Sequence, residues 1–229
     1  MMPQISVIVP VFGEAETING FLDTLQTVFP APAHEIIVVD GSPKRDTVTA
    51  IRLPQVRTAG SGKGRARQMN RGAAMARGEI LLFVHADTVL PPGAPGVITH
   101  LLDTDKGLKG GAFSLGIDDD RLLLRIIACS ANLRSRLTRV PYGDQSIFLR
   151  KWYFDRVGGF LEIPIMEDLE LMTRIRKQGG RIHILKQKSV TSSRRWKNEG
   201  IAACTLRNWL IRLLYHLGIP ADRLAALYK

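Results

Sequence analysis

The clearest structural signal in the chain is the stretch Gly78-Glu79-Ile80-Leu81-Leu82-Phe83-Val84-His85-Ala86-Asp87-Thr88-Val89-Leu90-Pro91. Its run of consecutive apolar residues, 80–84, is typical of a strand buried on both faces inside a mostly parallel sheet. His85 and Asp87 follow at the carboxyl end of this strand, where open α/β sheets bind their ligands. Asp87 is therefore a candidate to hold a metal or a charged substrate. The alternative is that Asp87 caps a helix and His85 only fills space.

The segments before this stretch alternate between strand-like and helix-like patterns. Residues 5–12 are rich in β-branched side chains and predict a buried strand, whereas apolar residues recur at helical spacing in residues 18–25. Residues 34–42 predict a second strand, at whose end Asp40 either binds a nucleotide or belongs to an Asp-Gly turn. This alternation predicts an α/β sandwich with right-handed crossovers. Residues 107–113 contain three glycines and are expected to form a turn or a strand edge.

Residues 59–78 contain a glycine-rich loop followed by a helix with a face of small side chains. Such a loop at a helix N-terminus can bind an anion, and Lys63 and Arg67 add positive charge there. The loop has neither the G-x-x-x-x-G-K-[ST] order of an ATPase nor the G-x-G-x-x-G order of a dinucleotide-binding protein. The sequence therefore predicts an anion contact at Lys63 and Arg67, but neither of these two protein classes.

The positive charge of this protein is concentrated in its second half. The chain has 229 residues, 45% of them hydrophobic, and a formal net charge of +11. Residues 1–120 carry 11 Lys and Arg against 13 Asp and Glu, whereas residues 121–229 carry 21 against 8. This asymmetry indicates a polyanionic partner, such as an anionic membrane or a phosphorylated substrate. Nucleic acid is not expected, because the chain has no zinc-finger spacing and no RNA-binding aromatic signature.

Two stretches, residues 121–140 and 201–217, mix apolar and basic side chains at helical spacing. In the second stretch, Leu206, Leu213 and Leu217 can share one helical face with Trp209 or Leu210. One interpretation is that both helices pack on the sheet or on a second copy of the chain. The other is that they lie on an anionic membrane surface and bring the site to a lipid-linked acceptor.

The sequence also carries signals about its compartment. Cys129 and Cys204 lie in apolar helical stretches without metal-ligand spacing, which predicts reduced thiols. The N-terminus shows no basic leader, and no uninterrupted apolar run reaches about 18 residues. We therefore expect a cytoplasmic protein, with peripheral attachment to the inner face of a membrane as the alternative.

Several motifs occur in the order in which family 2 glycosyltransferases of the GT-A fold carry them. They are Val9-Pro10-Val11-Phe12 with Glu14, Val38-Val39-Asp40-Gly41-Ser42, His85-Ala86-Asp87, Glu167-Asp168 and Arg195-Trp196. On these motifs, residues 4–196 resemble that family. The combination of H-A-D-T-x-L-P, P-Y-G-D-Q, M-E-D and S-x-R-R-W is similar to a small bacterial subfamily labelled arsenosugar-biosynthesis or selenodomain-associated glycosyltransferases.

The resemblance implies an architecture. The α/β fold would be GT-A, with a Rossmann-like, mostly parallel sheet, flanking helices and a basic helical C-terminal region. Residues 1–196 would form the glycosyltransferase domain, divided into a nucleotide-binding half, 1–91, and an acceptor half, 92–196. Residues 197–229 would form an amphipathic helical segment.

The resemblance also implies roles for matching residues. Nucleotide contacts fall to Pro10, Phe12, Glu14, Asp40 and Ala86, in addition to the anion contacts at Lys63 and Arg67. Asp87 would bind Mn²⁺ or Mg²⁺, and His85 stands where the family's D-x-D element has its first acid. Asp168 would be the catalytic base, with Glu167 beside it. The residues that would contact phosphate or acceptor are Asp144, Gln145, Arg194, Arg195 and Trp196.

The chemistry of sugar transfer gives these residue types a purpose. The reacting sugar becomes oxocarbenium-like while negative charge builds on the leaving diphosphate, which a cation and an arginine can stabilise. Inversion needs one carboxylate to take the proton of the acceptor, and like-charge repulsion from Glu167 would raise the pKa of Asp168. Each of these motifs also has a simpler interpretation. Residues 167–168 could be the acidic first turn of a helix, and residues 142–145 could be a turn. Residues 194–196 could be a solvated basic loop.

One departure from the family's pattern limits what the resemblance implies. Ser192 stands where the family's Q-x-x-R-W element has its glutamine, which argues against a processive polymerase. The leading hypothesis is an inverting hexosyltransferase that uses a UDP-sugar and a divalent metal, with a small metabolite or a lipid-linked molecule as acceptor.

Two other classes of function stay open. A sugar nucleotidyltransferase would need a basic G-x-G-T-x-M-type loop after the first strand, which residues 13–15 do not supply. A non-catalytic nucleotide-binding or membrane-surface adaptor would make Asp87 and Asp168 incidental. The sequence leaves the oligomeric state open, with a homo-oligomer as one alternative.

Overall fold

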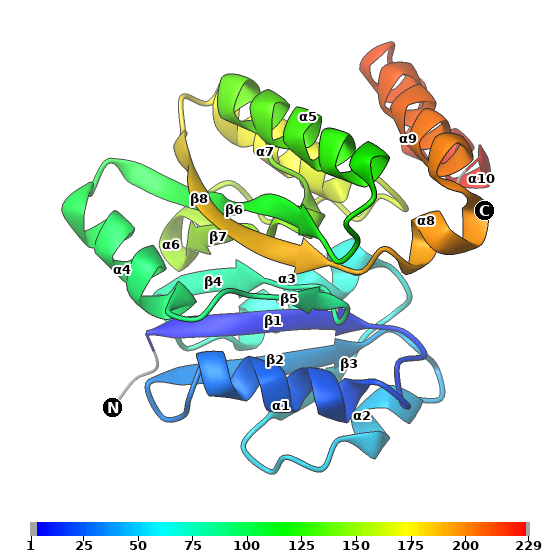
Figure 1. The fold of residues 1–229 in the computed structure, drawn as a ribbon. Helices are drawn as coiled ribbons and strands as arrows, with labels where there is room; N and C mark the ends of the chain where they lie inside the picture. Colours follow the sequence, from blue (N-terminus) through cyan, green and yellow to red (C-terminus); the bar gives the residue numbers. More distant parts are fainter. Residues whose placement is uncertain (1–3, 228–229) are drawn as a thin grey trace.

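The computed structural model describes residues 4–227, which form one eight-stranded sheet with flanking helices (Figure 1). The strands lie in the order β3-β2-β1-β4-β7-β6-β8-β5. Their bounds are β1 Ile5–Val11, β2 His34–Asp40, β3 Arg57–Gly60, β4 Ile80–Phe83, β5 Thr88–Val89, β6 Leu108–Ile117, β7 Phe148–Arg150 and β8 Arg181–Thr191. Parallel pairs join β1 to β2, β2 to β3, β1 to β4 and β6 to β8, and the other pairs are antiparallel. The expected α/β fold with a mostly parallel sheet is confirmed.

Helices connect most of these strands and cover both faces of the sheet. Their bounds are α1 Ile18–Val28, α2 Asp46–Ala50, α3 Arg65–Met75, α4 Ala94–Thr104, α5 Leu122–Thr138, α6 Lys151–Arg156, α7 Glu167–Lys177, α8 Arg194–Glu199, α9 Ile201–His216 and α10 Ala221–Leu227, with a 3-10 turn, η1, at Gly143–Gln145. The helical spacings in the sequence therefore locate α1, α3, α5 and α9 to within a few residues.

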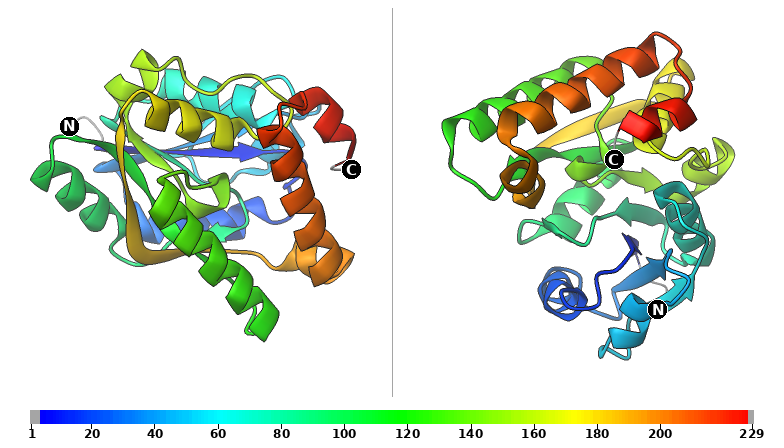
Figure 2. Two further views of the ribbon diagram at one scale, coloured as in Figure 1. Left: turned by 90° about the horizontal axis from the view of Figure 1, so that it is seen from above. Right: turned by 90° about the vertical axis from the view of Figure 1, so that its right-hand side faces the viewer.

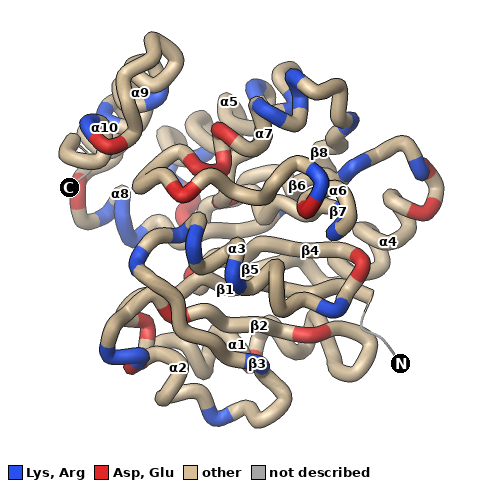
Figure 3. The backbone as a smooth tube through the Cα atoms, turned by 180° about the vertical axis from the view of Figure 1, so that it is seen from behind, with Lys and Arg blue, Asp and Glu red and all other residues tan. Residues whose placement is uncertain are grey.

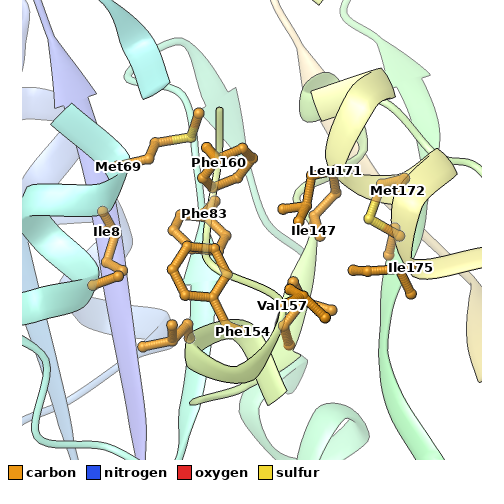
Figure 4. Packing of buried hydrophobic residues seen from close by; sticks show 14 of the residues in the cluster. Ile8, Met69, Phe83, Ile147, Phe154, Val157, Phe160, Leu171, Met172 and Ile175 are labelled. Carbon is orange, nitrogen blue, oxygen red and sulfur yellow. The ribbon is translucent and has the colours of Figure 1, made fainter. Parts of the chain in front are cut away.

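The hydrophobic core consists of two clusters, one on each face of the sheet, because successive side chains of a strand point to opposite faces. On β1, Val7 and Val9 belong to the cluster with α1 and α4, whereas Ile8 belongs to the cluster with α3, α6 and α7. Figure 4 shows the second cluster, in which Phe83 packs against Phe154 and Phe160. This cluster joins the first half of the chain to the second and supports the strand that ends at His85.

Strand β4 is buried over its whole length, as the run of apolar residues predicts. It pairs with β1 on one side and with β7 on the other, so both of its edges are occupied. His85 and Asp87 follow directly, and β5 then pairs antiparallel with β8. The backbone N–H of Ser192 donates to the carbonyl oxygen of Asp87 at 3.2 Å, which fixes the connection between β4 and β5.

The expectation of a turn or strand edge at residues 107–113 is wrong. Residues 108–117 form β6, a long strand inside the sheet between β7 and β8. A Cβ atom at Gly110 would collide with the carbonyl oxygen of Phe148, so the glycine permits close approach of β7 instead of turning the chain. The prediction failed because glycine occurs both in turns and in strands that approach a neighbouring strand closely.

The C-terminal helices α8 to α10 lie at the end of the molecule toward which β1 points, on the same side as the start of α5 (Figures 1 and 2). α5 contacts β6 through its inner face, where Leu124 and Ser135 are fully buried. α9 buries Cys204 and Ile211 in the same way. Within residues 4–227, none of the helices combines the length and the apolar content needed to cross a membrane.

Candidate active site

A cavity of about 700 Å³ opens at the edge of the sheet where β1 and β4 end. Its floor consists of the residues that follow these strands, including Phe12, His85 and Asp87. The N-terminus of α3 forms one side, and η1 with the start of α7 forms the facing wall. Helices α5 and α9 contribute side chains at its other sides. The cavity therefore collects residues from both halves of the chain.

His85 and Asp87 both line this cavity, at the position the sequence predicts. Asp87 is exposed, and the hydroxyl of Thr88 donates to its carboxylate across 3.5 Å. Burial lowers the pKa of His85 to about 3, and the nearby positive charge of Arg65 lowers it further. The imidazole is therefore neutral at physiological pH and keeps a lone pair that a metal ion can use.

A carboxylate and a neutral imidazole are a suitable partial ligand set for a divalent cation. Among residues 4–227, no group of three or more His, Cys, Asp and Glu side chains gathers closely enough to hold a metal alone. A cation at Asp87 would accordingly need ligands from a bound substrate or from water. The phosphates of a nucleotide supply oxygen ligands of the kind that Mg²⁺ uses.

Asp40 has a different environment from Asp87, although both follow buried parallel strands. Its side chain is fully buried, and its carboxylate accepts hydrogen bonds from the backbone N–H groups of Ser42, Thr47 and Val48 at 2.8, 3.1 and 3.3 Å. These bonds hold the loop after β2 and the start of α2. Asp40 is not among the residues that line the large cavity. Its observed contacts are structural, and its nucleotide role stays a prediction.

The glycine-rich loop brings basic side chains to the cavity. Lys63 lines it, with its ammonium group 5.0 Å from the centre of the exposed ring of Phe12. Arg67 instead points to the outside and forms an ion pair with Glu162 at 2.8 Å. Arg65, at the first turn of α3, lines the cavity in its place. The sequence singled out Arg67 and missed Arg65, since a loop with several arginines does not reveal which side chain turns inward.

The remaining predicted nucleotide residues are distributed around this edge of the sheet. Pro10 is buried within β1. Glu14 and Ala86 line a second, smaller cavity of about 310 Å³, which Asp87 shares with the large one. The hydroxyl of Thr17 donates to the Glu14 carboxylate at 3.1 Å. Asp87 and Ser192 line both cavities and thus connect them.

Asp168 lies on the wall that faces His85. Its carboxylate accepts two backbone hydrogen bonds, from the N–H of Gly143 at 2.6 Å and from the N–H of Leu169 at 2.7 Å. A Cβ atom at Gly143 would lie 3.1 Å from Nε2 of His85 and 3.3 Å from Oδ2 of Asp168. Only the backbone of Gly143 lies between the side chains of His85 and Asp168. A side chain at position 143 would contact both of them.

Two further carboxyl groups near Asp168 have raised pKa values. Burial raises the pKa of Glu167 to about 7, and the neighbouring charge of Asp168 adds to the effect. Burial and the same charge raise the pKa of Asp144 to about 6. The sequence predicts that Glu167 raises the pKa of Asp168, whereas the repulsion that the structure shows raises the pKa of Glu167. Three acids thus meet at one wall of the cavity.

Gln145 is the one member of the 142–145 motif whose side chain is fully buried. Its amide nitrogen donates to the carbonyl oxygen of Phe113 at 3.0 Å, and its amide oxygen accepts from the hydroxyl of Ser135 at 2.6 Å. The same oxygen accepts from the backbone N–H of Tyr142 at 3.3 Å. These contacts tie η1 to β6 and α5. The predicted acceptor contact of Gln145 is untested, and its visible contacts position Gly143 and Asp144.

The basic motif of residues 194–196 divides between the two cavities. Arg195 and Trp196 line the large cavity, and Arg194 lines the small one. Arg195 forms an ion pair with Glu199 at 3.3 Å. The indole N–H of Trp196 is buried and has no hydrogen-bond partner within residues 4–227. It is a donor that a bound molecule could satisfy.

Tyr142, from the motif of residues 142–145, connects α5 with α9 through two arginines for which the sequence predicts no role in the site. The guanidinium of Arg134 stacks on the ring of Tyr142, 3.6 Å from its centre. Arg212 donates to the hydroxyl of the same tyrosine at 3.2 Å. All three side chains line the cavity. No sequence signal could have found the contact of Arg212, because it is 70 residues from Tyr142 in the chain and the two meet only through the tertiary fold.

Comparison with known proteins adds a family and a fold. Residues 6–156 match the family described as Glycosyl transferase family 2. No curated protein sequence matches this chain. Among solved structures, the mannosyltransferase PcManGT from Pyrobaculum calidifontis in complex with GDP-Man and Mn²⁺ is 21% identical, with a TM-score of 0.69. That match covers 95% of this chain and 62% of PcManGT.

The TarS protein of S. aureus is also similar in fold. The match to TarS is 17% identical with a TM-score of 0.63, and it covers 82% of this chain and 36% of TarS. TarS 1–349 in complex with UDP-GlcNAc is 20% identical with a TM-score of 0.63, covering 82% and 58% of the two chains. This chain thus spans less than two thirds of these proteins. The GT-A fold that the sequence predicts is confirmed.

Proposed function

This chain belongs to glycosyl transferase family 2, and we propose that it transfers a sugar from a nucleotide-diphosphate sugar to an acceptor with inversion. The observation that carries the proposal is the meeting of His85 and Asp168 at Gly143. It brings the residues suited to a metal-bound diphosphate and the residue suited to activate an acceptor together in one cavity. A single displacement needs these two groups on opposite sides of the reacting sugar.

On the donor side, the residues that contact the nucleotide and its phosphates are Phe12, Lys63, Arg65 and Asp87. A divalent cation bound at Asp87, Mn²⁺ or Mg²⁺, would supply positive charge where the diphosphate leaves. Arg65 and Arg195 line the same cavity, and their positive charges would stabilise the negative charge of the leaving diphosphate. The neutral imidazole of His85 is available as a second protein ligand.

On the acceptor side, Asp168 is the general base. The two backbone hydrogen bonds from Gly143 and Leu169 hold its carboxylate toward the cavity. As the acceptor oxygen forms its bond to the anomeric carbon, the bond from that carbon to the diphosphate oxygen breaks. The acceptor proton passes to Asp168, and the negative charge leaves with the nucleoside diphosphate. Attack from the side opposite the leaving group inverts the anomeric centre.

The proposed donor is a UDP-sugar carrying a hexose, in keeping with the UDP-GlcNAc complex of TarS. A GDP-sugar is the alternative that the GDP-Man complex of PcManGT favours. The likeness to the arsenosugar-biosynthesis or selenodomain-associated subfamily rests on the motifs alone. In the same proposal, residues 1–91 serve the donor, residues 92–196 serve the acceptor, and the protein is cytoplasmic.

A donor screen tests the function directly. Thermal unfolding is measured with a panel of nucleotide sugars, with and without Mn²⁺, and the donor that stabilises the protein is then assayed for hydrolysis and transfer. We expect stabilisation that depends on the metal, followed by slow hydrolysis without acceptor. Release of pyrophosphate from a nucleoside triphosphate and a sugar phosphate would show a nucleotidyltransferase instead. Binding of every donor without turnover would favour a non-catalytic adaptor.

A further inference from the structure

Most of the large apolar side chains that residues 4–227 expose to solvent lie on α5 and α9. On α5, Leu122 is 70% exposed and Leu137 is 75% exposed, with Leu123, Ile126 and Leu133 between them. Leu206 and Leu213 of α9, together with Leu217 directly after it, are 64%, 57% and 70% exposed. Soluble proteins rarely expose contiguous apolar patches of this kind unless the patch contacts a partner. We call these two faces the outer faces of α5 and α9.

Both helices are attached to the domain by other residues than those of their outer faces. α5 buries Leu124 and Ser135 on the sheet, and α9 buries Cys204 and Ile211. Arg134 and Arg212 hold both helices to Tyr142, as described above. The inner faces are therefore satisfied by the domain itself, and the apolar outer faces point away from it. The first sequence interpretation is packing on the sheet or on a second copy of the chain. α5 contacts β6 of the sheet and α9 contacts α8 and α10, and neither contact covers the outer faces.

The charge around the outer faces restricts which partner can cover them. The sequence from Arg121 to Gly143 contains five arginines and no acid. Residues 200–221 contain two arginines, of which Arg207 pairs with Glu199 and Arg212 donates to the hydroxyl of Tyr142. Arg125, Arg136 and Arg139 are exposed beside the apolar residues of α5. Figure 3 shows basic segments along α9 and near α5. A second copy of the chain docked symmetrically would bring like charges together, whereas an anionic surface would compensate them.

The outer faces also have a fixed position relative to the cavity. Ile127 and Ala131 of α5 line it, as do Trp209 and Arg212 of α9. The two helices that expose apolar side chains are thus the same two helices that line the cavity. A surface bound by both outer faces would lie next to this part of the cavity.

We propose that the outer faces of α5 and α9 dock the protein on an anionic lipid bilayer. Apolar side chains enter the boundary between headgroups and acyl chains, and the neighbouring arginines bind lipid phosphates. This attachment is peripheral, in agreement with the absence of a membrane-crossing helix among residues 4–227. The docking goes beyond the proposed transfer reaction and does not depend on it.

Flotation with vesicles tests the docking. The purified protein is mixed with vesicles of phosphatidylcholine alone, or of equal parts phosphatidylcholine and phosphatidylglycerol, at low and high salt. We expect flotation with the anionic vesicles at low salt, reduced several-fold by high salt because screening weakens the arginine contacts. Protein that stays unbound with anionic vesicles at low salt would overturn the proposal.

Substitutions identify the surface. The combined variant Leu133→Ser, Leu137→Ser, Leu213→Ser and Leu217→Ser removes exposed side chains only and should lose flotation while its thermal unfolding is retained. Trp152→Ser is the matched control: Trp152 is 50% exposed on α6, which begins at the opposite edge of the sheet, next to Glu79. Its flotation should equal that of the unmodified protein.

Two outcomes of the variants would contradict the proposal. If the four-residue variant still floats, α5 and α9 are not the binding surface. If the unmodified protein is a dimer by light scattering, and the same four substitutions make it a monomer without any vesicle binding, the outer faces bind a second copy instead. Arg125→Gln with Arg139→Gln separates the contributions, since it should reduce the salt dependence of flotation and leave the apolar contact.

Discussion

Asp40 and Asp87 carry the same sequence signal, an acid directly after a buried parallel strand, yet the structure gives them opposite environments. Asp40 is fully buried, and three backbone N–H groups donate to its carboxylate. Asp87 is exposed at the junction of two cavities. The carboxylate of Asp40 is engaged by its own loop, whereas the carboxylate of Asp87 faces the space in which a ligand would bind.

Asp168 combines features of both. Two backbone N–H groups hold its carboxylate, as in Asp40, but it lines the large cavity, as Asp87 does. The comparison shows three uses for an acid at a strand or helix end, which the hydrogen-bond partners and the access to a cavity distinguish. Access to a cavity without backbone donors, as for Asp87, indicates a carboxylate that is available to a ligand. Backbone donors on both oxygens without access to a cavity indicate a structural role. Backbone donors with access indicate a positioned reactive group.

The largest expected effect is that of Asp168→Asn on catalysis. The amide cannot take a proton from the acceptor, so turnover should fall by roughly 10² to 10⁴, the usual contribution of a general base. Donor affinity, measured by calorimetry, should change little. Asp144→Asn is the matched comparison in the same cavity. If Asp168→Asn keeps most of its transfer rate while Asp144→Asn loses it, the base has been assigned to the wrong acid.

The next effect in size is on stability, at Asp40. Asp40→Ala leaves three buried N–H groups without their acceptor, which should lower the free energy of unfolding by about 3 kcal/mol. Asp87→Ala, at an exposed position, should change it by less than about 0.5 kcal/mol. Urea unfolding of the two variants measures the difference. Equal decreases in the free energy of unfolding for the two variants would mean that Asp40 and Asp87 do not differ in their structural role.

Asp87→Ala should show its effect on ligand binding. Loss of the carboxylate should remove the metal-dependent part of nucleotide affinity, about tenfold to a hundredfold, or about 1.4 to 2.7 kcal/mol. Calorimetry with UDP measures this in Mn²⁺ and again with a chelator, where the variant and the unmodified protein should agree. Unchanged affinity in Mn²⁺ would remove Asp87 from the site.

The smallest expected effect concerns pH and Glu167. Its pKa is about 7 in the folded protein, above the usual value of 4.5, so folding favours the protonated form. The stability that this protonated form contributes is complete below the usual pKa and is lost as the pH rises through about 7. Glu167→Gln should therefore be more stable than the unmodified protein by about 1 to 2 kcal/mol above pH 7 and equal to it below the usual pKa of 4.5.

The matched control for Glu167 is Glu162→Gln, which changes an exposed carboxylate that pairs with Arg67. This control should leave the pH dependence of unfolding as it is. A Glu167→Gln variant with the same pH dependence as the unmodified protein would show that Glu167 is ionised in the folded state. The three acids that line the cavity, Asp144, Glu167 and Asp168, would then carry more negative charge than the burial of Glu167 implies.

The sequence by itself determined the elements whose residues obey a local period. The apolar run of β4, the β-branched run of β1 and the helical spacings of α1 and α3 all appear where they were expected, because burial of a strand or a helix face depends on neighbours a few residues away. The order of the motifs also sufficed to indicate the family. It brought Asp87, His85 and Asp168 under consideration before their distances were known.

Only the tertiary structure decided which way the side chains at the ends of these elements point. It turned Asp40 and Gln145 inward, and it put Arg65 rather than Arg67 in the cavity. It also joined Arg134, Tyr142 and Arg212, and left the apolar faces of α5 and α9 uncovered. The physical reason is that these outcomes depend on contacts between segments far apart in the chain. A local period reports that a helix has an apolar face, but the packing of the whole domain determines whether that face is buried or left for a partner.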